Sequence, residues 1–181
     1  MKKISLLLGA ALMVLVMASC GSEKQVATVG PCPDCKATAD VFKYLGQHVA
    51  TGDRQIQQAR KMAANSARTQ LAAMVSATVK SVIDDYSSEY ISGENSDFNQ
   101  RLQEMSRTVV NQLLTGTPIT CEVQVPGSTP GNTICYACVE LTGKSVLDAI
   151  ASKVSNDEKL RTDFEYEKFK KVFDEEMSKL Q

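Results

Sequence analysis

The sequence lacks tryptophan and has little aromatic character. Aromatic side chains make up 6% of the 181 residues, so a hydrophobic core must be built largely from Ala, Val, Leu and Ile. His48 is the only histidine, which excludes metal sites built on histidine pairs, and we expect it at the surface. Positive charge is not in excess, because 20 basic residues are matched by 21 acidic ones. This balance, without a Lys/Arg cluster, argues against nucleic acid as a partner.

The most hydrophobic stretch lies at the N-terminus. Two lysines precede an apolar run from Ile4 to Met17, and the small residues Ala18 and Ser19 follow it. This pattern is that of a secretory signal peptide, and about 14 apolar residues are too few to span a bilayer comfortably. We predict that residues 1–19 are removed, which changes the net charge from −1 to about −3.

A cysteine follows this stretch directly. Met17, Ala18, Ser19 and Cys20 resemble the lipobox of bacterial lipoproteins, in which the thiol receives a diacylglyceryl group and becomes the mature N-terminus. One acyl chain binds membranes only marginally, whereas two or three hold a protein stably. The resemblance implies a lipid-anchored protein of a bacterial cell envelope, with Cys20 as its lipidation site. Gly21, and not Asp, comes next, which favours the outer membrane. The alternative is an ordinary signal peptide with an incidental cysteine.

The remaining chain divides by composition into three parts. Residues 20–39 are small and polar with Pro and Gly, which is typical of a flexible tether. Residues 40–155 carry the periodic apolar patterns of a folded domain, and residues 156–181 read as one amphipathic helix. Ser155 to Glu158 fits a capping box that opens this helix, whose apolar stripe packs on the domain or binds a partner.

Within the domain, the apolar spacing changes from one period to another. Val41 to Leu45 predicts a strand that ends at Gly46. From there, spacing by three or four residues predicts helices, and spacing by two predicts strands. The expected elements are a long helix from Asp53 to about Tyr90, Ala-rich in its first half and capped by Thr51 or Asp53; a second helix that stops at Gly116; a hairpin of 119–125 and 135–141; and a short helix around 144–154. This order predicts an α+β fold, with helices packed on one face of a small antiparallel sheet.

The middle of the chain resembles a family. The Ala-rich stretch QQARKMAANSARTQLAAMV follows a strand that contains Gly46, and LLTGTPITCEVQV and ICYACVEL come after it. Over residues 40–150 this is similar to the Lpp-twenty type of outer-membrane lipoproteins, whose domain is similar to the N-terminal domain of a flagellar assembly protein. The resemblance implies a non-catalytic protein with envelope or partner interactions. The hairpin cysteines, the CPDC sequence and the charged terminal helix are not part of that pattern.

Five cysteines remain besides Cys20, and disulfides are their default state outside the cytoplasm. Cys121 and Cys135 share the expected apolar face of the hairpin, which favours a cross-strand bond between them. Cys32 and Cys35 lie in a Pro-containing turn, where a bond between them closes easily. Cys135 and Cys138 point to opposite faces of a regular strand and lie about 10 Å apart, too far for a disulfide.

Two sharper hypotheses use the paired spacing of these cysteines. A redox dithiol would use the CPDC sequence, and a zinc site would gather Cys32, Cys35, Cys135 and Cys138. The sequence also lacks the pattern of a catalytic triad or a phosphate-binding loop, and Gly143 reads as a strand-to-helix turn. We therefore expect a non-enzymatic, lipid-anchored envelope protein without a cofactor. Its partners would be the membrane, through the lipid, and a protein or further copies of itself. A periplasmic thiol-redox protein and a zinc-stabilised scaffold are the alternatives.

Overall fold

A computed structural model describes residues 31–91 and 96–180. The predicted signal peptide, the lipobox and Cys20 lie outside these residues. The described elements follow one another as β1 (Val41–Thr51), the single 3-10 turn η1 (Asp53–Gln55), α1 (Ile56–Tyr90), α2 (Ser96–Thr115), β2 (Ile119–Pro126), β3 (Asn132–Thr142), α3 (Gly143–Ser155), α4 (Leu160–Asp163) and α5 (Tyr166–Ser178).

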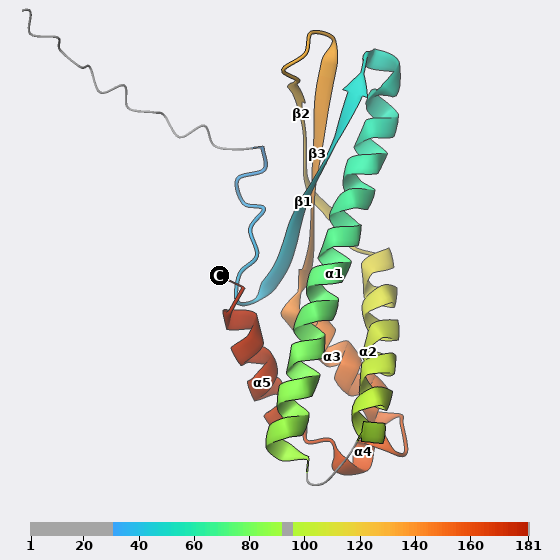
Figure 1. Ribbon diagram of the computed structural model, residues 1–181, viewed down its shortest axis with the longest axis vertical. Coiled ribbons are helices and arrows are strands. Elements are labelled where there is room, and N and C mark those ends of the chain that lie inside the picture. The colour runs from blue at the N-terminus through green and yellow to red at the C-terminus, as the bar shows by residue number, and fades with distance from the viewer. Residues whose placement is uncertain (1–30, 92–95, 181) are drawn as a thin grey trace, which may run out of the picture.

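The three strands form one antiparallel sheet with β3 in the centre and β1 and β2 at its edges. β1 pairs with β3 along its whole length, from Val41 opposite Thr142 to Thr51 opposite Asn132. Helix α1 lies along the sheet and continues beyond it, where α2 and α5 pack against it and α3 packs against α2 and α5 (Figure 1). The fold is therefore α+β, as the sequence predicts.

At the sheet, α1 and β1 approach each other closely because both present small side chains. A Cβ atom on Gly46 would lie 2.2 Å from the carbonyl oxygen of Ala63 and 2.5 Å from the amide nitrogen of Ala67. Gly46 therefore lies within β1 and does not end it: the predicted strand of 41–45 continues for six more residues. We call this half of the molecule the sheet end; its core residues are Ala50, Ala59, Ala63, Ala64, Cys135 and Ala137.

Beyond the sheet, larger side chains form the core of what we call the helical end. Tyr86 of α1 is fully buried, and its ring lies 5.4 Å from that of Phe169 in α5 and 5.8 Å from that of Phe164. The hydroxyl of Tyr86 accepts a hydrogen bond from the backbone N–H of Glu165 at 2.8 Å. The C-terminal segment thus packs on the domain as part of one core, and 156–181 is not a separate unit.

The C-terminal segment differs from the predicted single helix in two ways. It is divided into α4 and α5, with Phe164 and Glu165 in extended conformation between them. Ser155 ends α3 and does not cap a following helix; Asp157 takes that role, because its Oδ1 accepts the backbone N–H groups of Lys159 and Leu160 at 3.0 and 3.1 Å. The start of α1 also differs, since no side chain caps η1 or α1. Gly143 does begin a helix directly after β3, as expected.

Candidate functional site: the open face of the sheet

The sheet has one face covered by α1 and one that α1 does not reach. Ala50 of β1 and Cys135 and Ala137 of β3 pack with the alanines of α1, so they mark the covered face. Because successive side chains of a strand point to opposite faces, their neighbours along each strand belong to the other face, which we call the open face. The register adds the corresponding residues of β2. The open face consists of Lys43, Leu45, Gln47, Val49, Cys121, Val123, Val125, Ile134, Tyr136, Cys138 and Glu140.

Two disulfides hold residues 31–35 against the part of the open face formed by Lys43, Cys121, Cys138 and Glu140. We call this the lower part of the open face, and the rest its upper part. Cys32 bonds to Cys121 of β2, and Cys35 bonds to Cys138 of β3, with Cα atoms 5.8 and 5.9 Å apart. Lys43 adds a polar contact, because its ammonium donates to the carbonyl oxygen of Asp34 at 3.3 Å and pairs with Glu140 at 3.3 Å. The segment therefore belongs to the folded domain.

This arrangement corrects the predicted pairing of the cysteines. Cys121 does not bond to Cys135, and Cys32 does not bond to Cys35; each of Cys32 and Cys35 is joined to a different strand. Cys135 is a free, buried thiol. The prediction that Cys135 and Cys138 do not bond to each other is confirmed. The predicted tether of 20–39 is also too long, since its second half is attached to the sheet.

The error has a physical cause in the register of the hairpin. The pairing of β2 with β3 shifts between Ile119 and Cys121, and this irregularity places Cys121 opposite Cys138, with Gln124 opposite Cys135. A shift of one residue moves a side chain to the other face of a sheet. Cys121 therefore lies on the open face, and Cys135 on the covered one.

The same geometry bears on the two hypotheses about thiol chemistry. Cys32 and Cys35 form no bond with each other, so CPDC is not an internal dithiol pair. The four sulfurs of the hypothetical zinc site are divided between two disulfides and the free thiol of Cys135 on the opposite face. Within residues 31–91 and 96–180, no group of three or more His, Cys, Asp or Glu side chains could hold a metal ion.

Cys135 itself lies in an environment that makes its thiol unreactive. It is fully buried, and its thiol points to the carbonyl oxygen of Ile56 at 3.9 Å. Burial raises the pKa of the Cys135 thiol, and the nearby carboxylate of Glu122 raises it further. The guanidinium of Arg60 holds that carboxylate with an Nη2–Oε2 distance of 3.0 Å and keeps the pKa of Glu122 low. A reactive thiolate needs the opposite conditions, access and a lowered pKa.

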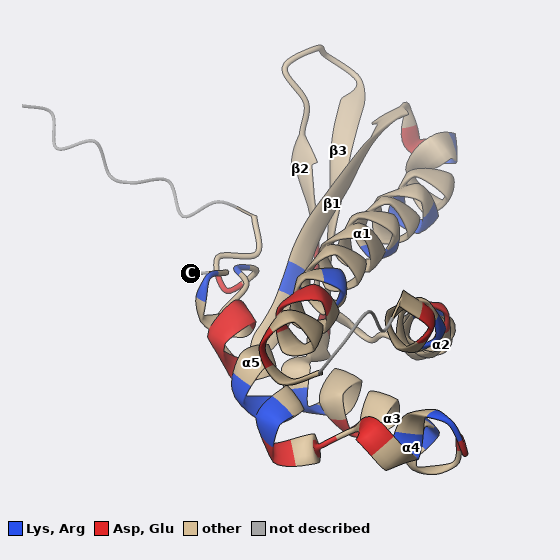
Figure 2. Cartoon of the chain, turned by 60° about the horizontal axis from the view of Figure 1, so that its bottom comes forward, with Lys and Arg blue, Asp and Glu red and all other residues tan. Residues whose placement is uncertain are grey.

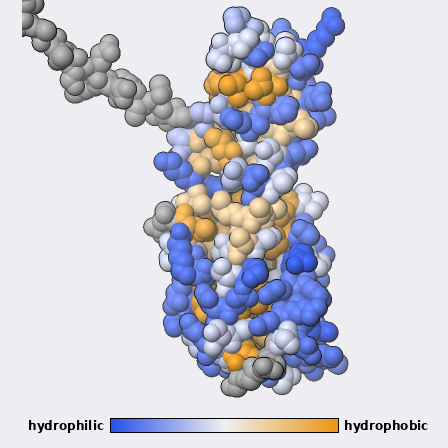
Figure 3. All heavy atoms as spheres, viewed as in Figure 1, coloured by the Kyte–Doolittle hydropathy of each residue, from blue (hydrophilic) through white to orange (hydrophobic). Residues whose placement is uncertain are grey.

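Among the described elements, no helix covers the upper part of the open face, which carries apolar side chains in rows across the strands. Val49, Ile134 and Val125 form one row, and Gln47, Tyr136 and Val123 form the next. Val49 is 48% exposed, the highest value among the large hydrophobic residues in the described part of the chain. Figure 3 shows hydrophobic side chains gathered over this end of the sheet.

This surface is also uncharged. Residues 123–139 contain no Asp, Glu, Lys or Arg, and residues 44–52 of β1 and the following turn contain none either. The projecting end of the β2–β3 hairpin is accordingly free of charge, whereas α4 and α5 carry many charged residues (Figure 2). His48, as expected, is exposed; it lies next to Val49 on β1. An apolar, uncharged surface on a sheet is typical of a contact with another macromolecule.

Comparison with known proteins adds no relative to this picture: no family model, no curated protein and no solved structure matches the chain. The fold and the site therefore define the class no further than a disulfide-linked α+β domain with an open apolar sheet face. Among the helices of residues 31–91 and 96–180, none is long and apolar enough to cross a membrane.

Proposed function

We propose that this protein is a non-enzymatic lipoprotein of a bacterial cell envelope, anchored by lipid on Cys20, and that it acts through protein contacts made by the open face of its sheet. The observation that carries the proposal is the uncharged apolar surface around Val49, Ile134 and Tyr136. Membership of the Lpp-twenty type family belongs to the same proposal. It is supported by a strand with Gly46 packed against an Ala-rich helix, followed by a hairpin.

A second copy of this chain fits the open face best. A two-fold interface places the same patch on both sides, so it must be complementary to itself. Without charged residues, the upper open face meets its own copy without like-charge repulsion and without burying an unpaired charge. Two sheets that pack face to face also bring such side-chain rows together.

The disulfides limit how far this surface lies from the membrane. A tether of residues 20–39 could reach about 70 Å, but attachment at Cys32 leaves about 12 residues, which extend to at most about 40 Å. The open face is the face to which Cys32 and Cys35 are bound, so the chain that leads to the proposed anchor leaves the domain on the side of the contact surface. We infer that the protein makes its contacts close to the bilayer.

The lipid anchor is tested by Cys20→Ser in the full chain. We expect the unsubstituted protein to fractionate with membranes and to carry N-terminal acyl groups in mass spectra, and we expect the variant to lose both properties. Ser19→Ala, which keeps a small residue before the cysteine, is the matched control. A soluble, unacylated protein whose location does not depend on Cys20 would contradict the proposal.

The contact surface is tested by Val49→Lys and Val125→Lys in the mature domain. Each adds a charge to the open face, and both are expected to convert a concentration-dependent dimer into a monomer in sedimentation equilibrium. Met62→Lys is the control, because Met62 on α1 is 44% exposed, close to the 48% of Val49, and lies outside the face. A protein that is monomeric before substitution at all concentrations would contradict the second copy as the partner. An equal effect of all three variants would contradict the open face as the surface.

A further inference from the structure

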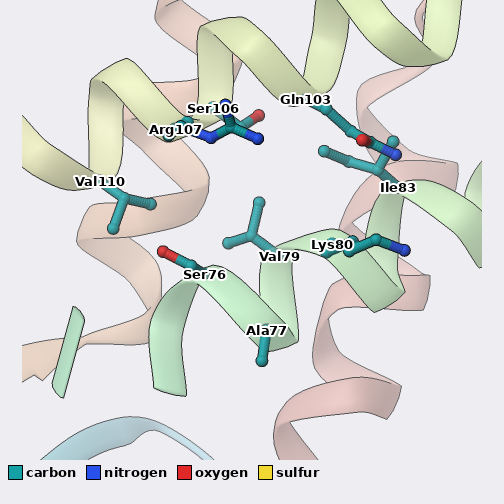
Figure 4. A pocket seen from close by; sticks show the side chains of 9 residues that line it. All are labelled: Ser76, Ala77, Val79, Lys80, Ile83, Gln103, Ser106, Arg107 and Val110. Carbon is teal, nitrogen blue, oxygen red and sulfur yellow. The ribbon is translucent and has the colours of Figure 1, made fainter. Parts of the chain in front are cut away.

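A pocket lined by both apolar and polar side chains lies in the helical end, away from the open face. It is formed between the second half of α1 and the middle of α2, with a volume of about 290 Å³ (Figure 4). Val79 and Ile83 of α1 and Val110 of α2 supply its apolar wall. These three side chains are at most 3% exposed, so the wall is part of the core of the helical end. Apolar pockets with a few polar groups are the usual form of small-molecule sites.

One polar group of the pocket is buried without a partner. Ser106 of α2 lines the pocket and is 1% exposed, yet its hydroxyl has no hydrogen-bond partner among the described residues. An unsatisfied buried hydroxyl costs about 1–3 kcal/mol. A buried hydroxyl without a partner in the chain can be satisfied by a water molecule or by a ligand, and the pocket is the side on which either can approach.

The charges at the rim leave one cation uncompensated. Asp84 is the acceptor for two rim residues: the ammonium of Lys80 lies 2.5 Å from it, and the amide of Gln103 donates to it at 3.0 Å. Arg107 is exposed, lies next to Ser106 in α2, and forms no ion pair within the described residues. Figure 4 shows both side chains on the α2 side of the pocket. A guanidinium fits a carboxylate through two parallel hydrogen bonds.

We propose that this pocket binds a small amphipathic anion, a carboxylate with a short aliphatic chain. The chain would lie against Val79, Ile83 and Val110, and the carboxylate would bind the guanidinium of Arg107 and accept a hydrogen bond from the Ser106 hydroxyl. A volume near the lower limit of small-molecule pockets limits the ligand to a short chain. This site is independent of the open face and of the proposed dimer.

Titration with octanoate, followed by amide chemical shifts of the mature domain, tests the proposal. We expect shifts confined to residues lining the pocket on α1 and α2. We also expect octanoate to bind at least about tenfold more tightly than octanol, a difference of about 1.4 kcal/mol. Arg107→Gln should abolish that preference, and Arg54→Gln, which removes an exposed guanidinium at the sheet end, should leave it unchanged. No shifts at millimolar octanoate, equal affinities for octanoate and octanol, or shifts elsewhere would overturn the proposal.

Two further variants separate binding from stability. Ser106→Ala removes the unsatisfied hydroxyl, so we expect an equal or higher melting temperature without ligand together with weaker octanoate binding. Ser76→Phe, at an exposed position of the lining, should fill the pocket and prevent binding while the protein stays folded. Unchanged octanoate affinity in either folded variant would show that the ligand does not occupy this pocket.

Discussion

The two ends of the molecule use opposite ways of building a core around the same helix. At the sheet end, α1 presents alanines and approaches the sheet so closely that β1 needs a glycine. At the helical end, the same helix presents Tyr86, Val82 and Ile83 to neighbours that carry phenylalanines. Each buried methylene contributes about 0.8 kcal/mol, so small side chains stabilise less per residue than large ones. Both disulfides are attached to the sheet, where the core side chains are small.

Adding a side chain at the sheet end should have the largest effect. Gly46→Leu would place a Cβ 2.2 Å from the Ala63 carbonyl, and backbone atoms cannot move away as a flexible side chain can. We expect a loss of more than about 5 kcal/mol, enough to unfold a domain of ordinary stability. Far-ultraviolet circular dichroism during thermal unfolding measures the effect. Gly116→Leu is the control, because the nearest atom to its added Cβ lies at 3.9 Å; a similar loss there would contradict the argument.

Removing side-chain volume should affect mainly the helical end. Phe169 is fully buried between Tyr86 and Phe164, and we expect Phe169→Ala to cost about 4 kcal/mol through lost burial and a cavity. At the sheet end, Ala63→Gly removes only one methyl group and should cost about 1 kcal/mol. Urea unfolding of both variants measures the difference. Equal losses would mean that the two cores do not differ as described.

Removal of one disulfide should cost about 3 kcal/mol. With Cys32–Cys121 intact, the bond between Cys35 and Cys138 closes a further loop of only about 20 residues, and the loss follows from the loop entropy of the unfolded chain. The double variant Cys35→Ala, Cys138→Ala avoids a free thiol that could exchange with another cysteine. Cys135→Ala, which breaks no bond, is the control, and urea unfolding without reductant is the measurement. A loss no larger than that of the control would contradict a stabilising role.

The type and order of the elements as far as α3 could be predicted from the sequence because they depend on local periodicity. The alanines of α1 recur at helical spacing, and the alternation in β2 and β3 marks a hairpin. The extent of β1 past Gly46 could not be predicted, since a glycine in a strand normally weakens it. Its role depends on Ala63 and Ala67, which approach it only in the folded protein.

The candidate site was less accessible to sequence reasoning. Pairing of the cysteines depends on one irregularity between Ile119 and Cys121, and no local pattern marks it. The open face could have been suspected from the absence of charge in residues 123–139. The alternating pattern of the strands instead indicates a hairpin with only one buried face. The pocket at Ser106 depends on how α1 and α2 cross, which periodicity does not specify.

The smallest effect we predict concerns pH, and at the helical end it should follow the ion pair between Arg101 and Asp157. The guanidinium of Arg101 in α2 lies 2.7 Å from the carboxylate of Asp157 and, with the backbone N–H groups of Leu160 and Lys159, holds the pKa of that carboxyl below its ordinary value. A carboxyl with a lowered pKa in the folded state stabilises the protein above its unfolded pKa, about 3.9, and this contribution is lost as the pH falls through the folded pKa. Asp157→Asn should therefore lower the melting temperature at pH 7, and the difference from the unsubstituted protein should shrink below about pH 4.

The control is Asp53→Asn, which removes an exposed carboxylate at the sheet end that forms no ion pair within the described part of the chain. The melting temperature of this variant should follow that of the unsubstituted protein across the same pH range. Parallel melting curves for the two variants would show that the ion pair between Arg101 and Asp157 does not contribute to stability in this pH range.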